Sequence, residues 1–162
     1  AAAGGVLAAM LMTQALYKKV DLTMALNGAL AGLVSITAGP DLTNHMMSIV
    51  IGGIGGVLVV IAVPLLDKLK IDDVVGAISV HLVAGIWGTL AVGIFGSGDL
   101  RVQIIGIVAI GVFVIVTSSI VWLALKYTIG IRVSDEDEDL GLDMVELGLE
   151  AYPEFGRGSQ RG

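Results

Sequence analysis

Apolar residues run through most of this chain in five long stretches, and short polar connections separate one stretch from the next. Each stretch is close to the roughly 20 residues that an α-helix needs to cross the hydrocarbon core of a bilayer. Helices are preferred to strands because lipid offers no partner for unpaired backbone groups, and the runs are too continuous for the alternating strands of a membrane barrel. The expected spans are about 1–17, 22–39, 45–66, 73–97 and 101–129.

Composition agrees with this pattern. Hydrophobic residues make up 56% of the chain and charged residues 15%, against roughly 25% charged residues in a soluble domain. Glycine occurs 23 times, and Gly28 with Gly32, like Gly52 with Gly56, places small residues on one helix face. Such faces favour close helix packing in lipid. The sequence therefore predicts an all-α fold, a polytopic transmembrane helical bundle.

Charge divides the chain into two regions. Residues 1–131 hold six acidic and six basic side chains, whereas residues 132–162 hold nine acidic and three basic ones. We interpret 1–131 as the transmembrane domain and 132–162 as an acidic tail. An acidic tail argues against nucleic acid as a partner.

No constellation for catalysis or cofactor binding is found in the sequence. The chain has no cysteine, which excludes disulfides, zinc–thiolate sites and thiol nucleophiles. Neither a nucleotide-binding loop nor a nucleophile with its base is present. We expect no enzyme activity, no cofactor and no metal site.

Basic residues set the expected orientation. They follow the first, third and fifth stretches, whereas the other side of the membrane holds only Arg101. By the positive-inside rule, this asymmetry places the tail in the cytoplasm. The residues concerned are Lys18, Lys19, Lys68, Lys70, Lys126 and Arg132. The first residues, 1–5, contain no initiator Met and no basic region, so we expect a fragment of a longer protein and no signal peptide.

His81 is the residue of most functional interest. It follows Asp73 by eight positions, about 12 Å along a helix, which would place it near the middle of the bilayer. Titratable groups at such depth are costly and usually face a bundle interior or a water-filled path. His81 could hydrogen-bond a small polar solute or relay a proton; the alternative is a structural histidine bonded to a neighbouring helix. His45 lies at a segment end, so the two are not expected to share a metal.

Asp72 and Asp73 open the fourth stretch. Carboxylates at a helix start accept hydrogen bonds from free N–H groups and suit the helix dipole. We expect a helix cap at this pair, and the alternative is a role in a cytoplasmic pore mouth.

Two blocks, supported by residues 27–39, carry a resemblance to a known family. In the first, Asp72 and Asp73 precede His81, and Gly85 and Gly88 follow it at the fourth and seventh places. The second lies in the tail and consists of residues 130–134, five consecutive acids and the Gly141-Leu142-Asp143 motif, with a final block at 150–155. Together they resemble the Amt/Mep/Rh ammonium transporter family over about residues 1–155.

The resemblance implies the last five of eleven helices plus the cytoplasmic tail. Such proteins are homotrimers in a cell membrane, and each protomer has its own apolar pore lined by paired histidines. His81 matches the second of these; the first histidine, the outer recruitment site and the aromatic gate would precede residue 1. The tail implies a regulatory role, with a PII-class signal protein as a possible partner, through Gly141, Leu142, Asp143, Gly148 and Tyr152.

Five positions depart from the family's usual pattern. Leu82 stands where Gly is common, which puts the pore width near His81 in doubt, and Leu147 replaces a His of the tail block. The other three departures are Val74, Ala84 and Val145, and the last replaces a regulatory Thr of plant relatives.

The predicted function is conduction of ammonium or ammonia across the membrane. An Rh-type ammonia gas channel is an alternative with the same fold, although the acidic Gly-Leu-Asp tail favours the Amt branch. A non-transporting ammonium sensor or structural membrane subunit is the alternative of another class, and a polar residue deep in an apolar segment speaks against a purely structural role.

Overall fold

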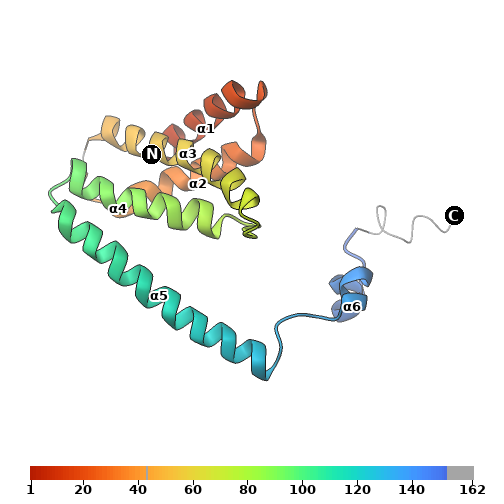
Figure 1. Cartoon of the computed structure of the whole chain (residues 1–162). Helices are drawn as coiled ribbons and strands as arrows, with labels where there is room; N and C mark the ends of the chain where they lie inside the picture. Colours follow the sequence, from red (N-terminus) through yellow and green to blue (C-terminus); the bar gives the residue numbers. More distant parts are fainter. Residues whose placement is uncertain (43, 153–162) are drawn as a thin grey trace. The chain divides into compact units, whose positions relative to one another are not determined.

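The structure is a computed structural model that describes residues 1–42 and 44–152. Its chain divides into two compact units, Ala1–Phe113 and Val114–Gly162, which are described separately here. Every regular element of the described residues is helical (Figure 1). The predicted all-α class is confirmed.

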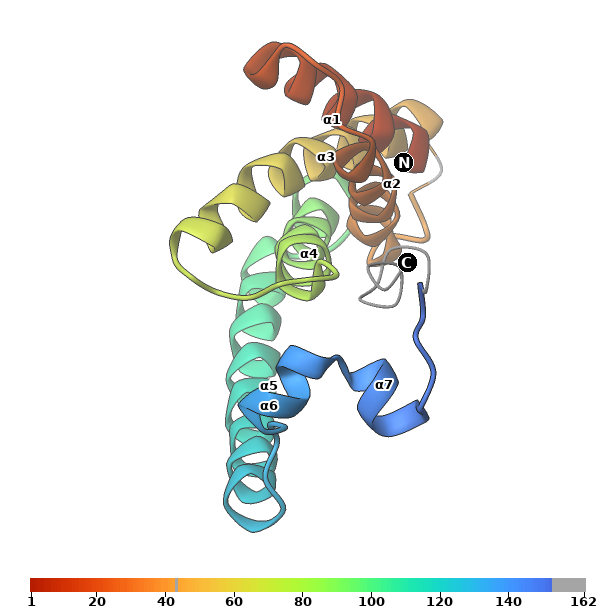
Figure 2. The ribbon, with the colours of Figure 1, turned by 90° about the vertical axis from the view of Figure 1, so that its right-hand side faces the viewer.

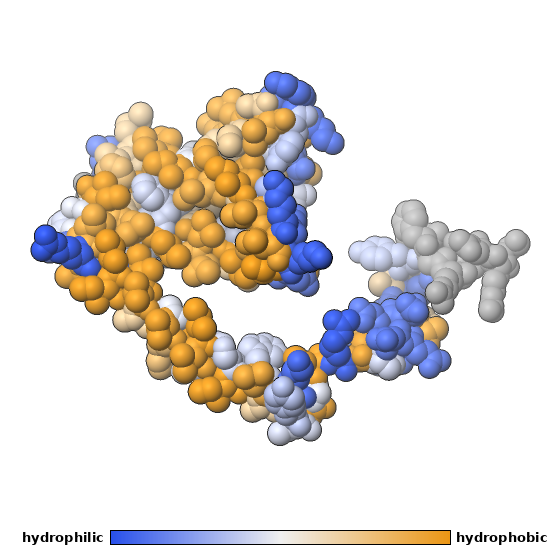
Figure 3. All heavy atoms as spheres, viewed as in Figure 1, coloured by the Kyte–Doolittle hydropathy of each residue, from blue (hydrophilic) through white to orange (hydrophobic). Residues whose placement is uncertain are grey.

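The first unit is built from apolar helices. They are α1 (Ala2–Tyr17), α2 (Leu22–Thr37), α3 (His45–Lys68), the short π-helix η1 (Ala77–Leu82) and α4 (Val83–Phe95), followed by the start of α5 (Leu100–Thr128). The α3 helix, the combined run Ala77–Phe95 and α5 are long and apolar enough to cross a membrane, whereas α1 and α2 are shorter apolar helices of 16 residues. Figure 3 shows apolar side chains over most of the visible face of α1–α4.

Side-chain caps define where several of these helices begin. The Asp21 carboxylate accepts a hydrogen bond from the Met24 N–H at 2.9 Å, and the Asn44 side chain accepts from Met46 and Met47. Both residues lie in the polar connections of the sequence. They suit a helix start because the first N–H groups of a helix have no acceptor within the helix and need one from a side chain.

The helices α1, α2 and α3 all pack against one another, and α4 packs against α2 and α3 (Figure 2). Glycines make the closest approaches. A side-chain carbon at Gly5 of α1 would overlap the carbonyl oxygen of Gly28 on α2, and one at Gly56 of α3 would overlap the Gly5 carbonyl oxygen. The predicted packing role of the spaced glycines is confirmed for Gly28, Gly32, Gly52 and Gly56, which are all buried.

The core of the first unit is small and made of compact side chains. Ala9, Ala31, Val59, Val60, Val80 and Ala84 form its central cluster. Buried hydroxyls satisfy themselves within their own helices: Thr13 donates to the Ala9 carbonyl oxygen at 2.9 Å, and Ser35 donates to that of Ala31 at 2.6 Å. These back-bonds are the ones that serine and threonine commonly make in apolar helices.

The second unit begins within α5 and continues through the tail. It contains two short helices, α6 (Asp135–Leu140) and α7 (Leu142–Leu147). No residue of α5 is buried, and the described tail is exposed or half-buried throughout. The sequence analysis described 135–139 only as a run of acids in the tail, and the structure shows that these residues are helical.

Candidate functional site

The candidate site lies where the chain passes from α3 into α4. Gly76 has a left-handed backbone with φ 78° and precedes η1, and α4 continues directly from η1. The π character is visible in the backbone, because the His81 N–H donates to the Gly76 carbonyl oxygen at 3.2 Å and the Val83 N–H reaches that of Ile78. Short π segments of this kind occur frequently at functional sites.

The Asp73 carboxylate holds the start of η1. It accepts hydrogen bonds from the Ile78 N–H at 3.0 Å, the Ser79 N–H at 2.8 Å and the Ser79 hydroxyl at 2.7 Å. Burial raises the pKa of Asp73, but the hydrogen bonds from Ser79 and Ile78 outweigh this effect and hold the pKa below its ordinary value. Asp72 is exposed and makes no side-chain hydrogen bond within the described residues.

His81 lies on η1, four residues after its start at Ala77. The helix begins only at Ala77, because residues 74–76 form a turn. At an α-helical rise, His81 therefore lies about 6 Å along the axis from the start of the helix. This is a correction to the 12 Å that a helix starting at Asp73 would give. The imidazole is exposed and makes no hydrogen bond within the described part of the chain, whereas the neighbouring Val80 is fully buried. The two side chains thus occupy different faces of η1.

The face of η1 and α4 that carries Val80 is fixed against α2 and α3. The Trp87 indole N–H donates to the Ile51 carbonyl oxygen of α3 at 3.0 Å, and its ring meets Phe95 edge to face at 6.4 Å. At Gly88, a side-chain carbon would come within 2.5 Å of the Ser35 carbonyl oxygen of α2. These contacts hold the segment that presents His81.

Sequence reasoning missed two parts of this arrangement. The sequence analysis assigned no partner to Trp87, and it treated residues 77–82 as part of an α-helix over 73–97. A tryptophan in an apolar segment usually seeks an acceptor, so the first had a usable signal. No residue type in 77–82 distinguishes a π-helix from an α-helix.

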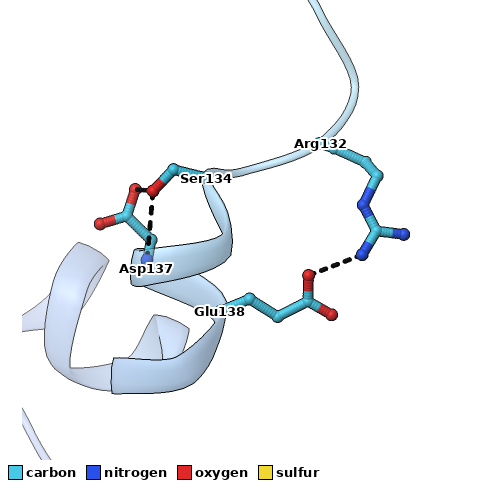
Figure 4. A network of polar contacts seen from close by, with 4 residues as sticks. All are labelled: Arg132, Ser134, Asp137 and Glu138. Atoms are coloured by element: carbon cyan, nitrogen blue, oxygen red, sulfur yellow. Dashed lines mark hydrogen bonds and ion pairs between the residues drawn. The ribbon is translucent and has the colours of Figure 1, made fainter.

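The tail residues singled out by the sequence form a local structure of their own. Ser134 caps α6 by accepting from the Asp137 N–H at 3.1 Å, and Arg132 pairs with Glu138 at 2.6 Å (Figure 4). Both members of the pair are largely exposed, so its contribution to stability is small.

Asp143 ties the start of α7 to the residues after it. Its carboxylate accepts from the Ala151 N–H at 2.8 Å and the Met144 N–H at 2.9 Å, and these bonds lower the pKa of Asp143. Gly141, with φ 95°, and Gly148, with φ 67°, flank α7 in backbone conformations that favour glycine. Leu142 and Tyr152 are exposed. Positions 153–155 of the predicted tail motif, like the rest of 153–162, lie outside the described residues.

The described side chains form no candidate metal site. Within residues 1–42 and 44–152, no group of three His, Asp or Glu side chains is arranged to hold a metal ion. The arrangement at Asp73 and His81 offers instead a fixed carboxylate that caps the segment and, on the exposed face, an imidazole able to donate or accept a hydrogen bond.

These features define the class. Glycine-packed apolar helices, several of them long enough to cross a membrane, make this an α-helical integral membrane protein. The chain belongs to the ammonium transporter family, whose model matches residues 1–152. The resemblance noted from the sequence is therefore confirmed.

Individual relatives agree with this assignment. The chain is 42% identical to a putative ammonium transporter of Synechocystis over 81% of its length, and 40% identical to the ammonium transporter Amt1 of Haloferax mediterranei over 93%. It is 39% identical to the ammonium transporter Amt2 of Archaeoglobus fulgidus over 96%. The chain spans 30%, 30% and 38% of these three relatives.

A solved structure named Sensor Amt Protein is also similar. It shares 32% sequence identity with this chain and superimposes with a TM-score of 0.84. The match covers 90% of this chain and 39% of the solved one. Both kinds of name, transporter and sensor, occur among the relatives.

Proposed function

We propose that this chain forms the C-terminal part of an ammonium transporter that conducts ammonium or ammonia through an apolar, histidine-lined pore in each protomer. The observation that carries the proposal is the placement of His81. Its imidazole is the exposed polar group of a π-helix that Asp73 anchors, at the start of an apolar segment of a family member.

The chemistry of the imidazole suits this role. In its neutral form it has one donor and one acceptor nitrogen, so it can hydrogen-bond ammonia or ammonium that has lost its water shell. Its neighbours in the sequence, Val80 and Leu82, are apolar, and Leu82 is also exposed. A proton and ammonia could cross separately, with histidines as the relay.

The complete assembly is part of the proposal. Because the chain spans about a third of its relatives, the remaining pore wall, including a partner histidine for His81, would come from residues outside this chain. Three protomers would form the trimer. The protein would lie in the cell membrane. The distribution of its basic residues supports a tail on the cytoplasmic side, where a PII-class protein could reach it.

The test is uptake of labelled methylammonium by vesicles that hold the complete protein. His81→Ala should reduce uptake at least tenfold or change the ion selectivity, while trimer assembly is retained. His45→Ala is the matched control, since His45 is the first residue of α3 and lies outside the segment that carries His81. Wild-type uptake and selectivity in the His81 variant would show that this histidine does not line the pore.

A second candidate is an ammonium sensor, favoured by the similarity to a structure named Sensor Amt Protein. A sensor would bind ammonium and change the state of its tail without net uptake. Absence of uptake together with ammonium-dependent protease protection of residues 132–152 would favour that function. An Rh-type gas channel would instead conduct ammonia without charge movement, which current recording on the same vesicles distinguishes.

A further inference from the structure

Trp87 makes a polar contact between two helices of the first unit. Its indole N–H donates to the carbonyl oxygen of Ile51 on α3 at 3.0 Å. The buried hydroxyls of Thr13 and Ser35, by contrast, bond back within their own helices. Because a carbonyl oxygen has two lone pairs, Ile51 can accept from Trp87 and still take part in the bonds of its own helix. The indole therefore ties α4 to α3 at one defined point.

This tie lies where the helices have little room to move. Ile51 is fully buried. At Gly88, the residue after Trp87, an added side-chain carbon would come within 2.5 Å of the Ser35 carbonyl oxygen on α2. The helix α4 thus meets α3 and α2 at successive positions, and a rotation of α4 about its own axis would carry the indole N–H away from Ile51.

His81 lies between this tie and the one made by Asp73. The Asp73 carboxylate accepts from the N–H groups of Ile78 and Ser79, just before His81 in η1. Trp87 follows His81 by six residues, and η1 continues into α4 without a break. A helical segment that is held on both sides cannot turn the residues between without breaking one of the ties. The direction of His81 therefore depends on Trp87 as well as on Asp73.

We propose that Trp87 is a positioning residue for ammonium selectivity, because its hydrogen bond to Ile51 holds α4 in the rotation that directs the His81 imidazole at the solute. This role rests on the proposed function, which places His81 in the pore. Ammonium has N–H groups that an imidazole nitrogen can accept, whereas a potassium ion of the same charge has none. A turned imidazole therefore loses the contact that distinguishes the two ions.

Trp87→Phe in the complete protein tests this role, because it keeps an aromatic ring near Phe95 and removes only the N–H donor. Methylammonium uptake by vesicles, per folded trimer, should fall about fivefold, the effect of losing one hydrogen bond. Potassium should also compete with uptake more strongly than in wild type. Trp122→Phe is the matched control, since Trp122 lies on α5 and is 60% exposed; uptake and competition should then stay at the wild-type level.

The His81→Ala background separates positioning from packing. Without an imidazole to direct, Trp87→Phe should have no further effect on selectivity, so the effects of the two substitutions should not add. A tryptophan that only stabilises the fold would lower the melting temperature in both backgrounds and leave the selectivity of each unchanged, which would contradict the proposal.

A second replacement keeps the test decisive where Trp87→Phe fails to assemble. The amino acid 3-benzothienylalanine at position 87 retains the shape of tryptophan and has sulfur in place of the N–H group. Wild-type uptake and selectivity per folded trimer with this replacement would overturn the proposal. If His81→Ala also transports like wild type, the proposed function itself is wrong. If His81→Ala alone changes transport, only the role of Trp87 is wrong.

Discussion

Asp72 and Asp73 are adjacent and chemically identical, yet their surroundings differ completely. Asp73 accepts three hydrogen bonds at the start of η1, whereas Asp72 is exposed and its carboxylate accepts none among the described residues. The sequence could locate the pair at a helix start but could not say which of the two carboxylates turns inward. That choice is made by the backbone turn at 74–76 that ends with Gly76.

Asp73→Ala should therefore destabilise the protein and Asp72→Ala should not. We expect a loss of about 0.5–2 kcal/mol for Asp73→Ala, the usual cost of removing a capping side chain. Thermal unfolding of the complete protein in detergent, followed by circular dichroism, measures the difference. Equal melting temperatures for the two variants would contradict the capping role.

The same pair predicts a pH dependence. The folded pKa of Asp73 lies below its ordinary value, so its stabilising contribution is present above the unfolded pKa and is lost as the pH falls through the folded pKa. The melting temperatures of wild type and Asp73→Ala should differ at neutral pH and converge in acid. Asp72→Ala should follow wild type over the whole range.

At the scale of elements, glycine determines how closely the helices approach. The sequence analysis recognised the spaced glycines of α2 and α3, and the structure adds Gly5, whose backbone lies against both Gly28 and Gly56. The amino-acid sequence shows which glycines share one face of a helix, but it does not show which other helix packs against that face. Only the packed structure identifies the three-helix contact.

Gly56→Ala should loosen this contact. Its new methyl group would overlap the Gly5 carbonyl oxygen, and overpacking of this kind costs about 1–3 kcal/mol. Gly106→Ala on α5 is the matched control, because nothing lies within 4 Å of the added carbon. We expect a lower melting temperature for the first variant and an unchanged or higher one for the second. The opposite order would mean that the helices do not meet at Gly56.

The limits of sequence reasoning also appear at this scale. Long apolar runs between polar connections were enough to predict helices, because a membrane leaves few alternatives. Helix ends were predictable where Asp21 and Asn44 supply caps. The π-helix was not, since its backbone bonds depend on Gly76 and on Asp73 reaching forward to Ser79. The Trp87 bond to α3 required knowledge of a partner 36 residues away.

At the scale of the whole molecule, the tail is the region whose role depends most on partners. Its apolar side chains, including Leu140, Leu147 and Leu149, are exposed within their own unit. Surface ion pairs such as Arg132–Glu138 contribute little, so docking of the tail should depend on apolar contacts and shift readily when a partner binds.

Truncation after Arg132 should leave a folded trimer whose methylammonium uptake is altered or no longer responds to a PII-class protein. Size-exclusion chromatography measures assembly, and vesicle uptake with and without the signal protein measures control. A variant in which the acids at 135–139 are replaced by their amides is the control, since it removes charge but keeps the apolar side chains. If the truncated protein transports and responds like wild type, the tail is a passive appendage.

The π-helix has a consequence for how this segment can vary. Its backbone bonds span one residue more than those of an α-helix, and one residue corresponds to about 100° of rotation. Loss of a single codon within 77–80 could restore α-helical winding and would turn His81 and α4 relative to Asp73 by roughly that angle. A substitution cannot produce such a turn. The direction in which His81 points is thus encoded partly by the number of residues between Asp73 and α4, and an insertion or deletion there changes it in one discrete step.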